Sequence, residues 1–398
     1  MIPLDDARAF VLDGCAPLPP AEIPLADALG LVLAEAVEAA EPIPAFPNTA
    51  MDGFAVRAAD TADAPATLQI VGTIAAGDRG DLPVGPGQAA RIMTGAPMPP
   101  GADAVIMVEL TEVDGDRVTA TATVPEGNHV RAPGEDVVAG QLVFEAGAVL
   151  DPGHLGMLAS LGRTAARAVP RPRVGVMSTG DELVDDGSPL QHGQIRDSNR
   201  RTLLALLERD GFEAIDLGLG RDDPDELRAR IADGVRRCDA IVTSGGVSMG
   251  DFDFVKVVLD ELGDMRWMQV AIKPAKPLAF GIVDDTPVFG LPGNPVSSMV
   301  SYELFARAGL RRMAGHPAPI RPTTPAVAGE ELRRRPDGKT HFARVVSAVG
   351  EDGRLVVRSA GGQGSHMLHA MATADSLAVL PDGDGVTAGD PVDVLVLR

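Results

Sequence analysis

Carboxylates, lysines and glycine turns occur in several short stretches of the second half of the chain. One stretch, residues 243–253, reads TSGGVSMGDFD and places Gly245 and Gly246 shortly before Asp251 and Asp253. Glycine lets backbone N–H groups approach an anion closely, whereas carboxylate oxygens are ligands for Mg²⁺. The combination predicts a bound phosphate that carries a magnesium ion.

The spacing of the outer glycines in this stretch, Gly245 and Gly250, matches a Walker A loop. Asp251 and Phe252 stand where such a loop has lysine and serine or threonine, which excludes a P-loop ATPase. The pattern also differs from GxGxxG, so a dinucleotide site is disfavoured. The alternative is a tight strand-to-helix turn in which the glycines solve only steric problems.

Acidic residues also follow two other predicted strands. Glu182 stands in STGDEL and Asp222 in LGLGRDD. Mg²⁺ is usually held by one or two carboxylates together with phosphate oxygens of a substrate. Glu182, Asp222 and Asp253 are therefore the candidate metal ligands, whereas Asp223 is better explained as a helix cap. For each acid taken alone, a solvated surface position is the alternative.

The stretch KPAKP, residues 273–277, is the basic counterpart of these acids. Its prolines restrict the backbone, and Lys273 and Lys276 are spaced to point into one region. Two fixed ammonium groups suit an oxyanion. The alternative is a pair of solvated surface lysines.

An α/β domain is predicted to position these groups. Residues 170–316 alternate apolar strands such as VGVM (174–177) with helices such as SNRRTLLALLERD (198–210) and DPDELRARIADGVRR (223–237). Repeated β–α units favour a largely parallel, doubly wound sheet with helices on both faces. Ligands of such sheets bind outside the carboxyl ends of the strands, so we expect the charged loops and LPGNPVS (291–297) to meet at one edge.

The rest of the chain differs in pattern from this α/β domain. Residues 1–47 and 136–169 favour helices, as in LADALGLVLAEAVEA (25–39), and we interpret them as one helical N-terminal domain. Residues 48–135 alternate short apolar stretches with glycine and proline turns, which predicts an inserted small β domain. Residues 317–398 show a similar pattern and predict a second β domain at the C-terminus.

Composition limits the function of the chain. The formal net charge is −21, so a surface that binds nucleic acid or an anionic membrane is not expected. Hydrophobic residues make up 45%, which allows real cores, but no run of about 18 apolar residues predicts a membrane span. Cys15 and Cys238 form no CxxC pair, and no signal peptide is evident. We therefore expect a cytoplasmic protein.

Seven motifs in order resemble those of the bacterial molybdopterin molybdenumtransferases and the gephyrin E domain. The resemblance covers essentially the whole chain. The motifs are NTAMDGFAV (48–56), RIMTGAPMP (91–99), GVMSTGDEL (175–183), GQIRDSN (193–199), TSGGVSMGDFDFVK (243–256), IKPAKP (272–277) and GLPGNPVS (290–297).

This resemblance implies a fold, a reaction and an assembly. The implied fold has a helical N-terminal region, an inserted β domain, an α/β molybdopterin-binding domain and a C-terminal β-barrel-like domain. The implied enzyme takes adenylylated molybdopterin and molybdate with Mg²⁺, hydrolyses the adenylyl bond, inserts molybdenum at the dithiolene and releases AMP. The family is a homodimer whose active cleft is shared between the subunits.

The resemblance also implies roles for individual residues. Asp253, Asp222 and Glu182 match the cleft acids that meet the metal, and together with Lys273 and Lys276 they are the expected catalytic residues. The molybdate contacts match Lys273, Lys276, Ser297, Arg344 and Ser365. The substrate contacts match Gly245, Gly246, Ser248, Asp253, Pro292, Gly293 and Asn294, with Asp52, Thr94 and Asp136 offered across the dimer. The sequence departs from some relatives at Gln269, where they have a lysine.

Two other functions are compatible with parts of this pattern. One is the upstream adenylylation of molybdopterin by ATP, which the same α/β module performs in relatives that lack the flanking domains. The other is a non-catalytic scaffold, as in gephyrin. The sequence does not choose between metal-bound water and a molybdate oxygen as the attacking group.

Overall fold

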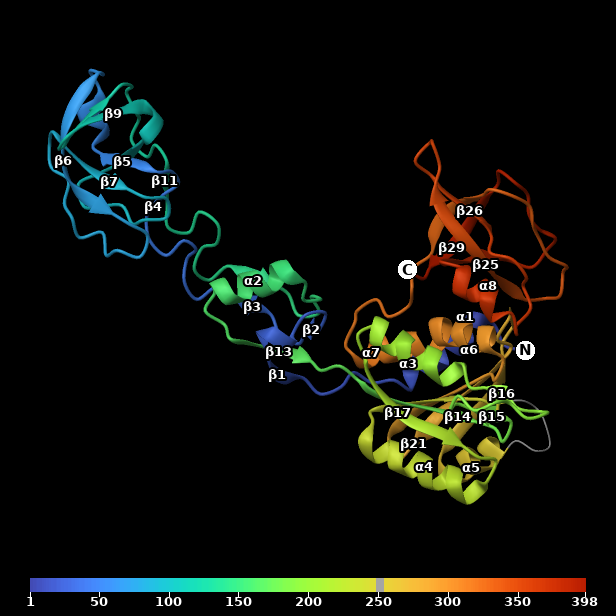
Figure 1. Ribbon diagram of the computed structural model, residues 1–398. Helices are drawn as coiled ribbons and strands as arrows, with labels where there is room; N and C mark the ends of the chain where they lie inside the picture. The colour runs from blue at the N-terminus through green and yellow to red at the C-terminus, as the bar shows by residue number, and fades with distance from the viewer. Residues whose placement is uncertain (248–253) are drawn as a thin grey trace. The chain divides into compact units, whose positions relative to one another are not determined.

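The computed structural model describes residues 1–247 and 254–398 (Figure 1). The chain forms two compact units. The first contains Met1–Ile23, Gly30–Ala34 and Arg167–Arg398, and the second contains Pro24–Leu29 and Glu35–Ala166. Within the described residues, we find no helix with the length and apolar character needed to cross a membrane.

A six-stranded sheet forms the centre of the first unit. Its strand order is β17 (Glu213–Gly220), β14 (Arg173–Thr179), β18 (Ala240–Ser244), β22 (Thr286–Leu291), β21 (Pro277–Val283) and β19 (Asp264–Gln269). The first four strands are parallel, and β21 and β19 pair antiparallel. Because β21 runs in the opposite direction, its first residues lie at the edge where the parallel strands end. The segment 273–277 therefore reaches the edge predicted from the sequence.

Helices cover both faces of this sheet, as predicted (Figure 1). Leu203 and Leu207 of α3 and Val300 of α6 pack into one apolar core, and Leu227 of α4 and Val258 of α5 pack into another. The helix bounds are α1 Leu4–Asp13, α3 Asn199–Arg209, α4 Pro224–Arg237, α5 Phe254–Leu262, α6 Pro295–Ser301 and α7 Arg307–Met313, with a π-helical turn at Tyr302–Ala306. The doubly wound architecture is thus confirmed.

The C-terminal domain contains a closed five-stranded barrel, which confirms the predicted β-barrel-like domain. Its strands follow the order β25 (Thr340–Val349), β26 (Leu355–Ser359), β23 (Thr324–Ala328), β29 (Pro391–Val396) and β27 (Ser376–Leu380), and pairing of β25 with β27 closes the ring. The short strand β20 (Ile272–Lys273) pairs with β25 in parallel. Lys273 is therefore anchored to the barrel by backbone hydrogen bonds.

The second unit contains a six-stranded sheet and a capped helix. The sheet order is β8 (Ala104–Met107), β5 (Gly53–Val56), β7 (Gln88–Ile92), β6 (Ala66–Ile74), β10 (Arg117–Ala120) and β9 (Thr111–Asp114). Helix α2 (Pro152–Ser160) has a capped start: Asp151 accepts from the backbone N–H of His154, and Pro152 occupies the first helical position. The inserted β structure is confirmed.

The prediction of a helix over residues 25–39 is wrong. The structure has a 3₁₀ turn at Leu25–Asp27 and the short strands β2 (Val32–Leu33) and β3 (Val37–Glu38). Gly30 adopts a φ of +79°, which interrupts a helix. Pairing of β2 with β13 (Ala165–Val169) and of β3 with β12 (Leu142–Phe144) then satisfies the backbone, so long-range pairing overrides local helix propensity.

Candidate active site

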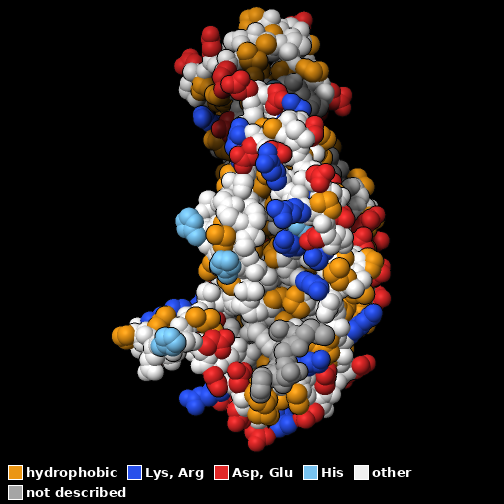
Figure 2. Space-filling model, turned by 90° about the vertical axis from the view of Figure 1, so that its right-hand side faces the viewer, with side chains coloured by type: hydrophobic (Ala, Val, Ile, Leu, Met, Phe, Trp, Pro, Cys, Tyr) orange, Lys and Arg blue, Asp and Glu red, His pale blue; other side chains and the backbone are white. Residues whose placement is uncertain are grey.

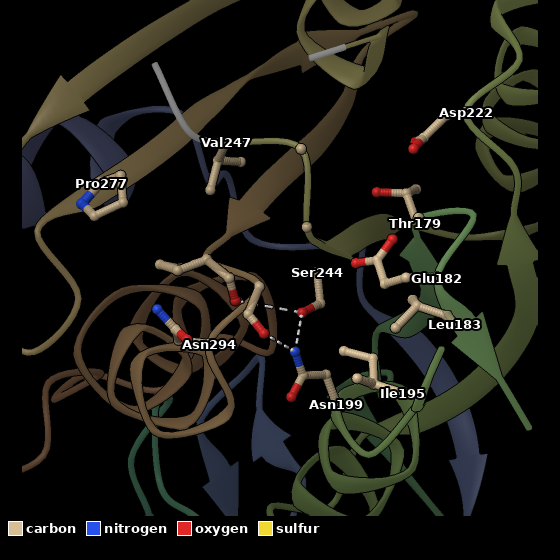
Figure 3. Close-up of a pocket in the computed structure, with 15 residues that line it drawn as sticks. Thr179, Glu182, Leu183, Ile195, Asn199, Asp222, Ser244, Val247, Pro277 and Asn294 are labelled. Atoms are coloured by element: carbon tan, nitrogen blue, oxygen red, sulfur yellow. Dashed lines mark hydrogen bonds between the residues drawn. The ribbon is translucent and has the colours of Figure 1, made fainter. Parts of the chain in front are cut away.

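A cavity of about 600 Å³ lies at the carboxyl ends of the parallel strands, where the sequence predicts a ligand (Figure 3). Loops after β14, β17, β18 and β22 all contribute to its wall. Seven of the predicted residues line it: Glu182, Asp222, Gly245, Gly246, Pro292, Gly293 and Asn294. We call this space the acid cavity.

Two carboxylates give the acid cavity its character. Glu182 and Asp222 lie on the same side of the cavity, with Thr179 beside them (Figure 3). Burial raises the pKa of Asp222, and the nearby charges of Asp181 and Glu182 act in the same direction. A site that gathers negative charge on hard oxygen atoms fits Mg²⁺.

Glycines let the strand-end loops approach one another closely. Gly180 has a φ of +144°, which favours glycine, and the carboxylate of Glu182 folds back over it, since a Cβ there would lie 2.4 Å from Oε2 of Glu182. Gly245 has a φ of +103°, and its Cβ would lie 2.7 Å from the carbonyl oxygen of Thr179. The glycine pair therefore brings the end of β18 against the end of β14.

Asn199 is a site residue that sequence reasoning missed, although its motif was noted. Its Nδ2 donates to Oγ of Ser244 at 2.9 Å and to the carbonyl oxygen of Gly293 at 2.7 Å (Figure 3). The side chain thus joins the start of α3 to the loops after β18 and β22. Asparagine at a helix start is typical of a capping residue, but the sequence does not indicate these long-range partners.

Part of the predicted site lies outside the described residues. Ser248 and Asp253, together with the rest of 248–253, fall in this part of the chain. Among the residues that the structure does describe, no group of three or more histidine, cysteine, aspartate or glutamate side chains is arranged to hold a metal ion. Glu182 and Asp222 are the members of the predicted metal set that can be placed.

A second cavity of about 600 Å³ lies beside the C-terminal barrel, and four lysine and arginine residues are part of its wall. Lys273 lines it together with Arg333, Arg334 and Arg335, and Asp337 contributes a carboxylate. We call it the basic cavity. On the face shown in Figure 2, Lys and Arg side chains gather in a central band, with acids mainly along its margins.

The cations of the basic cavity differ in how their charge is used. Nη1 of Arg334 donates to three backbone carbonyl oxygens, and its Nη2 donates to Asp337 and Asp382. The side chains of Arg335 and Lys273 are exposed and have no hydrogen-bond or ion-pair partner within residues 1–247 and 254–398. Arg334 is therefore a structural cation, whereas Arg335 and Lys273 present their charge to the cavity.

Arg344, on β25, is fully buried without a carboxylate partner in the described part of the chain. Its Nη2 donates to the carbonyl oxygens of Gly362 at 2.9 Å and Gly364 at 3.3 Å. Nε and Nη1 have no hydrogen-bond partner among the described residues, and burial lowers the pKa of Arg344. A buried cation with free donors is costly to the fold, which supports an anionic ligand at this position.

Other predicted molybdate contacts meet where the barrel touches helix α6. The backbone N–H of Val296 donates to the carbonyl oxygen of Ser365 at 3.1 Å. Ser297, which is buried, follows Val296 on α6, and Ser365 follows the Gly364 that accepts from Arg344. The structure thus brings Ser297, Ser365 and Arg344 into one region.

The structure divides the expected single site between two cavities. The acids line the acid cavity and Lys273 lines the basic cavity, while Lys276 is exposed and lies in neither set of lining residues. One short segment borders both spaces: Pro277 lines the acid cavity, and Lys273 and Pro274 line the basic cavity. The sequence predicted the common sheet edge but not this separation, because the barrel side chains that form the second wall follow much later in the chain.

In the second unit, two of the residues expected to be offered across a dimer lie together. The backbone N–H and the Oγ1 of Thr94 donate to Oδ1 of Asp52 at 2.6 and 2.7 Å, and these hydrogen bonds lower the pKa of Asp52. Asp136 is exposed, and its backbone N–H donates to the carbonyl oxygen of Ile43.

Comparison with known proteins identifies the family and the domain organisation of the chain. Three family models match the chain: the MoeA N-terminal region (domain I and II) over residues 2–162, a probable molybdopterin binding domain over 175–312, and the MoeA C-terminal region (domain IV) over 326–397. The solved molybdopterin biosynthesis moeA protein of Pyrococcus horikoshii OT3 superimposes with a TM-score of 0.80 at 27% identity over 100% of both chains.

Curated relatives match over nearly the whole length. The chain is 38% identical to the molybdopterin molybdenumtransferase of Haemophilus influenzae, over 99% of this chain and 98% of the relative. It is 40% identical to molybdopterin molybdenumtransferase 2 of Mycobacterium tuberculosis, over 97% and 96%. The resemblance seen in the sequence motifs is confirmed, and the chain belongs to the molybdopterin molybdenumtransferase family of enzymes.

Proposed function

We propose that this enzyme acts in molybdenum cofactor biosynthesis by inserting molybdenum from molybdate into adenylylated molybdopterin. In this reaction the adenylyl bond is hydrolysed and AMP leaves. The observation that carries the proposal is the pairing of an acid cavity with a basic cavity along one segment, residues 273–277. A substrate that must meet both a cation and an oxyanion needs such an arrangement.

The acid cavity supports a role in binding the phosphate end of the substrate. Glu182 and Asp222 would hold Mg²⁺ with Asp253, and the backbone at Gly245 and Gly246 would face the phosphates. A bound Mg²⁺ supplies charge neutralisation at the phosphoryl group and the departing AMP. The hydrogen bonds from Asn199 to Ser244 and Gly293 would fix the positions of the loops after β18 and β22 for this contact.

The basic side of the site supports a role in binding molybdate as a substrate. Lys273 has no partner of its own among the described residues, and Arg344 is buried with two unused donor nitrogens. Ser297 and Ser365 lie beside Arg344 and add hydroxyl donors, and Lys276 follows Lys273 on the same segment. Fixed cations at a dianion offset the repulsion expected from a chain of net charge −21.

We also propose that the enzyme works as a homodimer with a shared cleft. Asp52, Thr94 and Asp136 are the residues that one subunit would offer to its partner. The hydrogen bonds from Thr94 keep Asp52 ionised, as a role toward a cation or a substrate hydroxyl requires. Mixing a subunit that lacks Asp52 with one that lacks Asp222 would restore up to one intact cleft per dimer.

Release of AMP tests the proposed reaction. Purified protein with adenylylated molybdopterin and Mg²⁺ should release AMP and form molybdenum cofactor only when molybdate is added. Formation of adenylylated product from molybdopterin and ATP would instead support the adenylyltransferase alternative. Unchanged cofactor formation by a folded Asp253→Ala variant would support a non-catalytic scaffold.

A further inference from the structure

Arg200 is a buried arginine that follows Asn199 of the acid cavity, and it holds three carboxylates at once. Its side chain lies on α3 and is only 3% exposed. Nε donates to Asp197 at 3.0 Å, Nη1 donates to both oxygens of Asp216 at 2.5 Å, and Nη2 pairs with Asp185. A planar guanidinium holds its donors in fixed directions on three separate nitrogen atoms, whereas an ammonium group offers all three of its donors from one nitrogen.

We call the ion pair of Arg200 with Asp185 the first branch of this cluster, and it holds the loop that carries Glu182. Asp185 follows Glu182 by three residues and is tied to Arg200. The same loop is fastened by backbone hydrogen bonds from Ile195 to the carbonyl oxygen of Glu182 at 2.8 Å and from Asp197 to that of Val184 at 3.1 Å. Asp197 also accepts from Ser178 Oγ on β14 at 3.0 Å, so the loop is fixed to the sheet.

We call the ion pair of Arg200 with Asp216 the second branch, and it holds the strand that leads to Asp222. Asp216 lies on β17 where the register with β14 shifts, and its Oδ1 accepts from the backbone N–H of Gly218 at 2.8 Å. Arg200 holds this carboxylate in place. The orientation of the last turn of chain before Asp222 thus depends on the same guanidinium as the Glu182 loop.

We propose that Arg200 is a positioning residue that sets the spacing of the Glu182 and Asp222 carboxylates and thereby the affinity of the acid cavity for a divalent cation. It does not line the cavity itself. This inference rests on the proposed metal role of the two acids. Carboxylate pairs that face one another repel, so a metal site needs supports that keep them apart at a defined distance.

A purely structural role for Arg200 makes a different prediction, and the chain offers a matched control. Arg173 donates to Asp239 through Nη2 at 2.9 Å and through Nε at 3.1 Å. This ion pair lies where β14 and β18 begin, at the other end of these strands from the acid cavity. Removing this pair should affect stability but not the cavity. A substitution at Arg200 itself leaves buried Asp197 without its partner and risks unfolding, so the branches are the better targets.

The experiment measures binding of Mn²⁺ alone to the full chain by electron paramagnetic resonance. The variants are Asp185→Asn for the first branch, Asp216→Asn for the second and Asp239→Asn as the control. We expect the dissociation constant to rise by about tenfold in each branch variant and to stay unchanged in the control. Amide hydrogen exchange should quicken at 182–197 in Asp185→Asn and at 217–222 in Asp216→Asn.

A Glu182→Gln variant separates failure of this inference from failure of the proposed metal site. If Glu182→Gln weakens Mn²⁺ binding but both branch variants bind as the unmodified chain does, the positioning role is overturned. If Glu182→Gln also leaves binding unchanged, the acid cavity is not the metal site and both proposals fall. Equal weakening in the Asp239→Asn control would show a general loss of stability and would also overturn the positioning role.

Discussion

The acid cavity and the basic cavity have the same volume, about 600 Å³, but opposite charge. The acid cavity is lined by the ends of parallel strands, and the carboxylates of Glu182 and Asp222 lie on the same side of it. The basic cavity is lined by the barrel and by Lys273, whose charge is not neutralised by the residues that the structure describes. The carboxylates suited to a metal cation and the basic side chains suited to an oxyanion therefore lie in separate cavities, so neither set neutralises the other.

The two cavities also differ in what holds them. The acid cavity depends on glycines, which let the strand-end loops approach closely, and on Arg200, which we propose sets the spacing of the two carboxylates. The basic cavity depends on Arg334, whose terminal nitrogens donate to backbone carbonyls and to two aspartates. Arg335 and Lys273, in contrast, have no hydrogen-bond or ion-pair partner in the described part of the chain. Arg334 lines the basic cavity and serves structure there, whereas Arg200 lies outside the lining of the acid cavity and acts on it through its carboxylate partners.

The sharpest test of the acid cavity compares two neighbouring aspartates. Asp222→Ala should lower Mg²⁺-dependent AMP release by roughly 1,000-fold, because several kcal/mol of metal assistance are lost. Asp223→Ala should retain activity but lose about 1 kcal/mol of stability, since Asp223 caps α4 by accepting from the backbone N–H of Glu226 at 2.9 Å. AMP assays and urea unfolding of both variants check this, and equal activity in the two would refute the role of Asp222.

A second comparison sets two buried arginines of the barrel domain against each other. Arg334→Met should destabilise the chain by about 3 kcal/mol, because it leaves buried carbonyl and carboxylate partners unpaired. Arg344→Met should cost clearly less stability than Arg334→Met, because it leaves no carboxylate unpaired and removes a buried cation with two donors that lack a partner among the described residues, although the carbonyls of Gly362 and Gly364 lose a donor; molybdate use should be lost. Urea unfolding measures both, and a large loss of stability in Arg344→Met would contradict a ligand-binding role.

The lysines of the segment 273–277 should affect molybdate more than nucleotide. Lys273→Ala and Lys276→Ala should each raise the molybdate concentration needed for half-maximal activity by roughly tenfold, with little change in binding of the pterin nucleotide. Arg354→Ala removes an exposed cation of the C-terminal barrel domain, paired with Asp352, and serves as the control. If the molybdate dependence is the same in all these variants, the basic cavity has no part in oxyanion binding.

The smallest effect concerns pH and the crowding of the acids. The pKa of Asp222 is raised in the folded chain by burial and by repulsion from Asp181 and Glu182. Its ionisation therefore costs stability as the pH rises through this raised pKa. Metal-free Asp222→Asn should unfold at higher urea than the unmodified chain at neutral pH, and the gap should close below the ordinary pKa of about 3.9. If the difference in urea midpoint between the two proteins does not depend on pH, repulsion among these carboxylates does not destabilise the fold.

How far the sequence predicts this molecule depends on the range of the interactions. The α/β domain was predictable because apolar periodicity, Asp223 as a cap and glycines after strands are local signals. The helix expected over 25–39 failed because strand pairing with residues more than 100 positions away decides that segment. The contacts of Asn199 and Arg200 stayed hidden for the same reason, since three carboxylates on different elements define the role of Arg200.

Anomalous diffraction from one crystal tests the separation of charge most directly. A crystal soaked with AMP, Mn²⁺ and molybdate should show a manganese peak beside Glu182 and Asp222 and a separate molybdenum peak beside Lys273 and Arg344. Molybdenum bound in the acid cavity, or manganese bound away from both carboxylates, would contradict the division of labour between the two cavities.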